Sequence, residues 1–294
     1  MADYVLSCCS TADLSDEHYS ARDIHYVCFH FELDGKHYMD DMGKSYPIAD
    51  FYKAMADGAM TKTSQVSTGE YIEYFEPFLQ EGKDILHLCL DSAISGTINS
   101  AVVARDTLAD KYPDRKIIVL DSLAATAGFG LLMDKLADLR DEGKTIDELE
   151  AYVLEHRSEM HTWFFTSDLT YLIRGGRVSK AAGFIGGLLG ICPLLWVDGE
   201  GKLDARYKIR SKKKVMQKVI EVMEENAIGG VDYADKCYIN HSACMEDART
   251  MASMIEEHFP HLKGKVEIYD IGTTIGSHTG PNTVVVNFWG KKKA

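Results

Sequence analysis

Strand-like and helix-like segments alternate between residues 84 and 157, and this alternation restricts the chain to few folds. The runs 84–90 and 116–121 have the length and aliphatic content of buried strands. Helical patterns follow them, one ending near residue 112 and one spanning about 124–142. Strands that alternate with helices form a parallel sheet covered by helices. The sequence therefore predicts an α/β fold for this part of the chain.

Two capping boxes mark helix starts. Ser67 is followed by Glu70 and Thr145 by Glu148, the spacing at which the two side chains satisfy each other's free backbone N–H groups. We expect a helix after each, the first ending near Gly82.

The second half of the chain has a different pattern. An apolar run, the turn signal Asp-Gly-Glu-Gly at 198–201 and a returning strand predict an antiparallel hairpin. The other expected elements are strands at 4–7, 25–33, 192–197, 205–209, 236–240, 266–270 and 283–289, and helices at 211–226 and 245–258. We expect two domains: residues 1–160, an N-terminal parallel sheet flanked by helices, and residues 161–294, a C-terminal mixed α/β domain.

The charge and cysteine content narrow the classes of partner. Lys and Arg total 32 against 45 Asp and Glu, and a net charge of −13 makes nucleic acid an unexpected ligand. The seven cysteines form no CxxC pair and lie mostly in apolar runs, so we expect reduced, buried thiols. The acidic N-terminus lacks the features of a signal peptide, and a cytoplasmic protein is expected.

Residues 181–197 carry no charge, so a membrane-spanning helix has to be considered for this stretch. The stretch contains four glycines and Pro193 and is short for a spanning helix. A buried helix that leads into a buried strand explains it better, and stable membrane insertion is not expected.

Three clusters of hydroxyl and glycine residues, at 63–67, 92–97 and 275–281, stand at expected junctions between elements. The first two precede helices, where free N–H groups and the helix dipole favour an anion. The alternative is that Ser67 and Ser95 only cap their helices.

Catalytic interpretations have less support in the sequence. Ser95 lacks the GxSxG context of a nucleophile elbow. His278, expected in a glycine-rich turn between strands, could still act as its base, with Asp121 or Asp270 as the orienting acid. The chain has no HExxH and no phosphate loop, so no metal or nucleotide cofactor is expected. Arg174 and Arg177 are interpreted first as surface cations.

Five motifs together resemble the DegV family of bacterial proteins. They are KTSQVS (62–67), SAISGTINSA (92–101), LDSLAATAGFG (120–130), YLIRGGRVSK (171–180) and IGTTIGSHTGPN (271–282). The resemblance implies two α/β domains with a long-chain fatty acid, such as palmitate, held between them. It also implies a carrier without a catalytic residue of its own, and a fatty acid kinase as a partner to which the acid is presented.

The resemblance also assigns roles to single residues. Thr63, Ser95, Gly96, Thr97 and His278 would form the carboxylate site. Arg174 and Thr279 would contact the head group or a partner, and Phe184, Ile185, Leu188 and Leu189 would line the acyl chain. The chain departs from the family pattern at Cys9, where an Asp is usual, and at Asp91, whose charge would disfavour a nearby carboxylate. The alternative function is an acyl hydrolase or transferase that uses Ser95 and His278.

Overall fold

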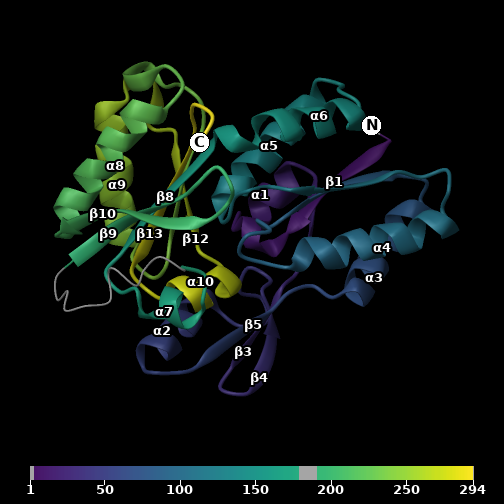
Figure 1. Ribbon diagram of the computed structural model, residues 1–294, viewed down its shortest axis with the longest axis horizontal. Coiled ribbons are helices and arrows are strands. Elements are labelled where there is room, and N and C mark those ends of the chain that lie inside the picture. The colour runs from purple at the N-terminus through teal and green to yellow at the C-terminus, as the bar shows by residue number, and fades with distance from the viewer. Residues whose placement is uncertain (1–2, 179–190, 294) are drawn as a thin grey trace.

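The computed structural model of the chain describes residues 3–178 and 191–293, and it contains two large sheets (Figure 1). The first is parallel throughout, as the alternation of strands and helices predicts. Its strands, in spatial order, are β2 (Ile24–Val27), β1 (Tyr4–Cys9), β6 (Asp84–Cys89) and β7 (Ile117–Asp121). The nearly unbroken burial along β1 and β6 explains why their sequences read as apolar runs and not as alternating patterns.

The second sheet has six strands and is antiparallel except for its last pair. Its strands are β10 (Leu203–Arg210), β9 (Ile191–Val197), β8 (Met160–Thr166), β13 (Thr283–Trp289), β11 (Cys237–His241) and β12 (Val266–Asp270). The predicted hairpin is confirmed as β9 and β10. Trp163 on β8 lies opposite Trp196 on β9, and their rings stack with centroids 5.2 Å apart.

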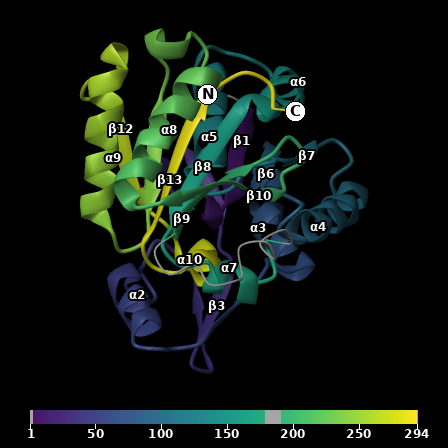
Figure 2. The ribbon, with the colours of Figure 1, turned by 60° about the vertical axis from the view of Figure 1, so that its left-hand side comes forward.

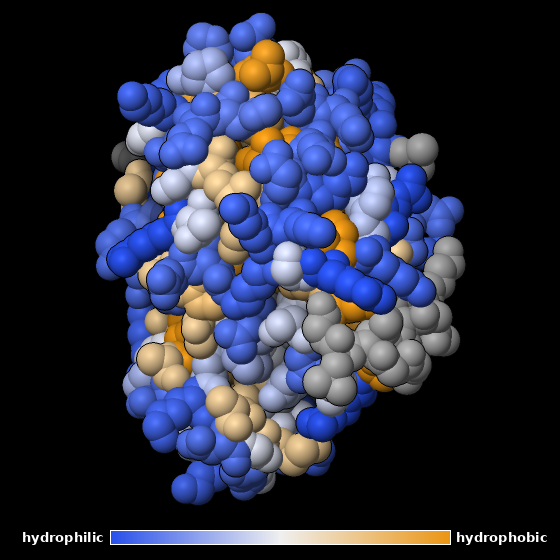
Figure 3. Space-filling model, turned by 90° about the vertical axis from the view of Figure 1, so that its left-hand side faces the viewer, coloured by the Kyte–Doolittle hydropathy of each residue, from blue (hydrophilic) through white to orange (hydrophobic). Residues whose placement is uncertain are grey.

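Helices arrange these sheets in layers. The helix α5 (Ala127–Asp141) contacts β1 of the first sheet and β8, β11 and β13 of the second, which explains why its residues are buried on nearly every side. The outer helices α3 (Thr68–Gln80) and α4 (Thr97–Lys111) cover the first sheet, and α8 (Lys212–Asn226) and α9 (Met245–His258) cover the second (Figure 1). The side of the molecule on which α8 and α9 lie is largely hydrophilic, as expected for amphipathic outer helices (Figure 3).

The capping boxes that the sequence predicts are confirmed. Ser67 accepts from Glu70 N–H and starts α3, and Thr145 accepts from Glu148 N–H and starts α6 (Ile146–His156). Helix α5 starts at Ala127, three residues later than about 124. The short helix α1 (Asp16–Ala21) was not predicted, although Ser15 caps it and acidic residues open its first turn.

A small third sheet was not predicted. It consists of β4 (Lys36–Met39), β3 (His30–Leu33) and β5 (Thr61–Ser64), and α2 (Ile48–Ala56) packs beside it. The expectation of one strand over 25–33 is wrong, because the chain leaves the parallel sheet after Val27. At Phe29, the backbone N–H donates to Ser10 Oγ at 3.1 Å and the carbonyl accepts from Asp40 N–H at 2.8 Å, which turns the chain toward β3.

The expected glycine-rich turn around His278 is instead a helix, α10 (Thr273–Thr279), which lies with α7 (Thr170–Arg174) at the end of the molecule occupied by the small sheet (Figure 2). Glycine and β-branched residues disfavour an isolated helix here. Distant carboxylates supply the missing stabilisation: Asp13 Oδ1 accepts from Gly272 N–H at 3.0 Å, and Asp40 Oδ1 from Thr273 N–H at 2.9 Å.

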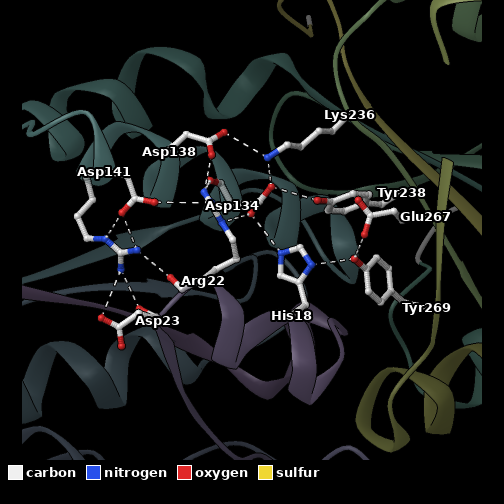
Figure 4. A network of polar contacts seen from close by, with 11 residues as sticks. His18, Arg22, Asp23, Asp134, Asp138, Asp141, Lys236, Tyr238, Glu267 and Tyr269 are labelled. Atoms are coloured by element: carbon white, nitrogen blue, oxygen red, sulfur yellow. Dashed lines mark hydrogen bonds and ion pairs between the residues drawn. The ribbon is translucent and has the colours of Figure 1, made fainter. Parts of the chain in front are cut away.

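A polar network connects the first and second sheets through α5 (Figure 4). The carboxylate of Asp134, almost fully buried, pairs with His18 at 3.2 Å, with Arg22 at 2.7 Å and with Lys236, and it accepts from Tyr238 Oη at 3.1 Å. Burial opposes ionisation of Asp134, but the hydrogen bonds from His18 and Lys236 outweigh it and hold the pKa of that carboxyl well below its usual range.

Two further expectations concern the cysteines and the membrane. All seven cysteines carry free thiols, and six of them are buried, Cys28 being only partly so. In the part of the chain that the structure describes, no helix combines the length and apolar character needed to cross a bilayer.

Candidate functional site

A cavity of about 600 Å³ lies where the three sheets approach one another. Its lining comes from β5, the turn after β6, the start of α5, strands β8 and β13, the end of the hairpin β9–β10, and the helices α7 and α10. One part of the wall is apolar, formed by Phe29, Leu90, Ile94, Phe164, Leu172, Val197, Leu203, Ile275 and Val285. The volume is within the range of small-molecule pockets, which is about 300–1,000 Å³.

Thr63 and His278, 215 residues apart in the sequence, meet at this cavity. Thr63 Oγ1 and His278 Nε2 are 2.8 Å apart, and both residues contribute to the lining. Thr63 lies on strand β5, and His278 is the penultimate residue of α10. If Nε2 carries the ring proton, the imidazole donates to Thr63 and leaves the threonine hydroxyl free to donate to a ligand.

The imidazole of His278 is neutral at physiological pH. Burial lowers its pKa to about 4, and the positive charge of Arg177 acts in the same direction. The ring lies directly against Gly175, where any side chain would overlap Nδ1. His278 is therefore a hydrogen-bonding group that contributes no charge.

Ser95 lies in the turn that links β6 to α4. Its backbone N–H donates to Asp91 O at 3.1 Å, and its Oγ accepts from Thr97 N–H at 3.3 Å. Because the backbone N–H occupies a lone pair of Oγ, the hydroxyl hydrogen can be directed at a ligand. Gly96 lets this turn approach the segment that follows β5, since a Cβ there would lie 2.9 Å from Gln65 Oε1. The two hydroxyl clusters thus lie side by side.

Thr97 and Asp91 lie apart from the cavity lining. Thr97 is fully buried, and its hydroxyl pairs with Tyr71 Oη at 3.0 Å. Asp91 Oδ1 accepts from Ala93 N–H at 2.9 Å, and its carboxyl packs against Gly201. Burial raises the pKa of Asp91 to about 7. The carboxyl of Asp91 therefore does not stand among the groups that line the cavity.

Of the two arginines in the GGR segment, Arg177 lines the cavity and Arg174 does not. Arg177 Nε donates to Ile94 O at 3.3 Å, next to the Ser95 turn. Arg174 is exposed, with its guanidinium 5.7 Å from the ring of Tyr171 and its Nη1 3.5 Å from Met60 Sδ. Both were expected first as surface cations. Arg174 is the last residue of α7, whereas Arg177 follows the turn at Gly175 and Gly176.

The remaining predicted site residues are Thr279 and the four residues proposed to line the acyl chain. Thr279 lines the cavity, with its Oγ1 3.3 Å from Ile275 O. Phe184, Ile185, Leu188 and Leu189, proposed as acyl-chain wall, lie outside the described residues. The described apolar wall comes from residues that were not predicted, since β-strand residues such as Phe164 carry no motif.

Thr126, which precedes α5, is a further lining residue that was not predicted. Its backbone has φ +55° and ψ −151°, a conformation that residues other than glycine strongly disfavour. Such strained conformations concentrate at ligand sites, and Thr126 is consistent with that tendency.

The hydrolase alternative requires a base beside Ser95. Among the described residues no hydrogen bond joins His278 to Ser95. His278 Nε2 pairs with Thr63 Oγ1, and Ser95 Oγ accepts from Thr97 N–H. Asp121 accepts from Ser92 N–H and Leu123 N–H, and Asp270 lies 3.4 Å from His241. The arrangement supports ligand binding better than nucleophilic catalysis.

One group of three potential metal ligands occurs in residues 3–178 and 191–293. It consists of Cys9, His87 and Cys89, all buried, and none of them lines the cavity.

Comparison with known proteins identifies relatives along the full chain. The family model described as an uncharacterised protein of the DegV family matches residues 9–291. A DegV domain-containing protein of Clostridium perfringens is 37% identical over 293 residues, covering 100% of this chain and 99% of the relative. Another from Streptococcus pyogenes is 35% identical over 279 residues, 94% of each chain.

Solved structures share the fold. A lipid-binding DegV protein of Thermotoga maritima has a TM-score of 0.84 at 26% identity and covers 100% of both chains. DegV of Bacillus subtilis, a fatty acid binding protein, has a TM-score of 0.82 at 25% identity, covering 99% of this chain and 100% of the other. The architecture of two large sheets is the DegV fold, and the chain belongs to the DegV family.

Proposed function

We propose that this protein binds one long-chain fatty acid non-covalently in the cavity and acts as its carrier, with no catalytic residue. The observation that carries the proposal is the cavity itself. Its wall is apolar over a large part, and the hydroxyls of Thr63 and Ser95 converge on it with the neutral imidazole of His278. The fatty acid binding ascribed to the relative from Bacillus subtilis supports the same ligand class.

The hydrocarbon chain supplies most of the affinity in this proposal. Burying about fourteen methylenes at about 0.8 kcal/mol each gives about 11 kcal/mol before the cost of association. Each hydrogen bond to the carboxylate adds about 1.5–3 kcal/mol. In this proposal the hydroxyls of Thr63 and Ser95 set the register of the ligand, and Arg177, a cationic residue of the lining, supplies positive charge to the cavity.

Extraction identifies the ligand. Solvent extraction of the purified protein, followed by mass spectrometry, is expected to recover a saturated or monounsaturated long-chain acid in near-stoichiometric amount. A folded protein that yields no fatty acid and takes up none when it is added would contradict the proposal.

Two substitutions test the carboxylate site. Thr63→Val and Ser95→Ala each remove one donor and are expected to weaken fatty acid binding by about ten- to a hundredfold. The matched control is Thr61→Val on the same strand, since Thr61 does not line the cavity. Equal affinities for Thr63→Val and Thr61→Val in a fluorescent fatty acid displacement assay would exclude Thr63 from the site.

The carrier role extends, in our proposal, to presentation of the acid to a fatty acid kinase. Arg174, exposed at the end of α7, is the proposed partner contact. Arg174→Ala is expected to lower the rate at which a fatty acid kinase and ATP convert the bound acid to an acyl phosphate, trapped with hydroxylamine. Fatty acid affinity should stay unchanged, and an unchanged rate would remove Arg174 from this role.

A further inference from the structure

Two cysteines and a histidine gather in the core of the parallel sheet. Cys9 ends β1 and Cys89 ends β6, and these strands are neighbours in a register that pairs Cys8 with Leu88. The next residues, Cys9 and Cys89, therefore stand side by side. His87 lies two residues before Cys89, so its side chain projects from the same face of the sheet. All three are fully buried.

The ligand atoms are spaced as a metal ion requires. The two sulfurs and one imidazole nitrogen all lie within 4.8 Å of one another, with Cys9 Sγ 3.8 Å from His87 Nε2. Zn–S bonds of about 2.3 Å and Zn–N bonds of about 2.0 Å at a tetrahedral angle place such atoms about 3.6 Å apart. Tyr71 Oη, 3.4 Å from Cys9 Sγ, is an oxygen at the distance of a fourth ligand.

The histidine is oriented for coordination by its other nitrogen. His87 Nδ1 is 2.8 Å from Ser7 Oγ, which in turn is 2.8 Å from Tyr74 Oη. When Nδ1–H donates to Ser7, Nε2 keeps its lone pair and faces Cys9. Hydrogen bonds of this kind, from the ring nitrogen that does not bind the metal, accompany most histidine ligands.

We propose that Cys9, Cys89 and His87 form a structural zinc site, with Tyr71 at the fourth position. Two thiolates and one Zn²⁺ sum to zero charge, which suits a fully buried location. Cys9 and His87 are 78 positions apart in the sequence, which explains why a search for closely spaced ligands passes over the group.

The proposed zinc site lies next to the Ser95 turn, which contributes to the cavity lining. Cys89 is the last residue of β6, from which the chain runs directly into the Ser95 turn, and Tyr71 Oη bonds Thr97 Oγ1 at the start of α4. A bound ion would tie β1, β6 and α3 together under this turn. Its role is structural and does not depend on which ligand the cavity takes.

Metal analysis of the refolded full-length chain tests the proposal. The protein is unfolded with chelator and reductant, refolded with Zn²⁺, freed of loosely bound metal and measured by elemental mass spectrometry. The wild type is expected to retain about one zinc per chain, and Cys9→Ala and Cys89→Ala none above background. Cys8→Ala, a buried neighbour that is not one of the three ligands, is the matched control and should keep its zinc. Zinc retained equally by Cys9→Ala would overturn the proposal.

Cobalt gives a second measurement that needs no variant. Wild-type protein refolded with Co²⁺ and reductant is expected to show the visible bands of tetrahedral coordination and the near-ultraviolet charge-transfer band of thiolate ligands. A chain that refolds by circular dichroism but shows neither band and retains no zinc would overturn the site.

Discussion

Gly175 is the residue whose missing side chain gives His278 its place beside Thr63. The imidazole occupies the space that a Cβ would fill, so the GGR segment and the helix α10 fit together only with glycine at this position. The neighbouring Gly176 has a different reason to be glycine, since its φ is +69°. Among the described residues, no atom beyond its two chain neighbours lies within 4 Å of the position that its Cβ would take.

Gly175→Ala should therefore lower fatty acid affinity by about tenfold, the value of one hydrogen bond, because it displaces His278 from Thr63. The matched substitution Gly176→Ala should cost about 1 kcal/mol of stability through its positive φ and leave affinity unchanged. Displacement titrations and urea unfolding of both variants measure the two effects. Equal losses of affinity would contradict the assigned role of Gly175.

His278 should also make stability depend on pH. Its folded pKa of about 4 lies below the unfolded value of about 6.5, so the unfolded chain binds the proton more readily. The neutral ring thus contributes stability above about pH 6.5, and this contribution is lost as the pH falls toward 4. The free energy of unfolding of His278→Gln should fall less between pH 7 and pH 5 than that of the wild type, as urea titrations at both pH values would reveal. Parallel curves would exclude this explanation.

Helix α10 is the element that turns a distant segment into part of the site. It carries Ile275, His278 and Thr279 into the cavity lining, while Gly276 packs directly against Tyr52 of α2. Tyr52 Oη donates to Ile271 O at 2.8 Å and so holds the segment just before the helix.

Gly276→Ala should weaken both stability and fatty acid binding, because the new methyl group forces α10 away from Tyr52. Overpacking of this kind costs about 1–3 kcal/mol. Gly69→Ala in α3 is the control of opposite sign: a Cβ there would lie 4.0 Å from Ser67 Oγ, and alanine should stabilise the helix by about 0.5–1 kcal/mol. Thermal unfolding and displacement assays distinguish the two outcomes, and a fully stable Gly276→Ala would refute the packing argument.

The elements that the sequence predicts are those whose signals are local. Ser67 with Glu70 and the Asp-Gly-Glu-Gly turn specify a helix start and a hairpin from neighbouring residues alone, and both are confirmed. Helix α10 depends on Asp13 and Asp40, which lie 259 and 233 residues away from the N–H groups they accept. Long-range caps of this kind leave no pattern within a window of sequence.

The same distinction applies to the candidate site. Thr63, Ser95 and His278 belong to motifs, and the structure brings all three to one cavity. Thr97 belongs to the same motif as Ser95, yet its hydroxyl turns to Tyr71, a packing choice that the sequence does not reveal.

At the scale of the whole molecule, the buried carboxylate of Asp134 connects the two large sheets. It receives contacts from α1 on one side and from Lys236 and Tyr238 on the other (Figure 4). Residues that follow β6 of the first sheet and residues of β8 and β13 of the second sheet line the cavity. The shape of the cavity therefore depends on how the two sheets are held relative to each other.

Asp134→Asn should lower the free energy of unfolding by about 2–3 kcal/mol, because it leaves Arg22 and Lys236 without their most buried partner. Asp138→Asn, whose carboxylate contacts the same two cations but is 34% exposed, should cost less than about 1 kcal/mol. The depressed pKa of Asp134 implies that its contribution is present above about pH 4 and is lost as the pH falls further. Urea unfolding at pH 7 and pH 3 measures both points, and equal losses for the two variants would contradict the argument.

The stacked Trp163 and Trp196 have a spectroscopic consequence. Together with Trp289 they are the three tryptophans of the chain, and all of them lie on the six-stranded sheet. Their sequence neighbours Phe164 and Val197 line the cavity. Tryptophan fluorescence therefore reports on the six-stranded sheet and on the cavity beside it, and it does not report on the parallel sheet.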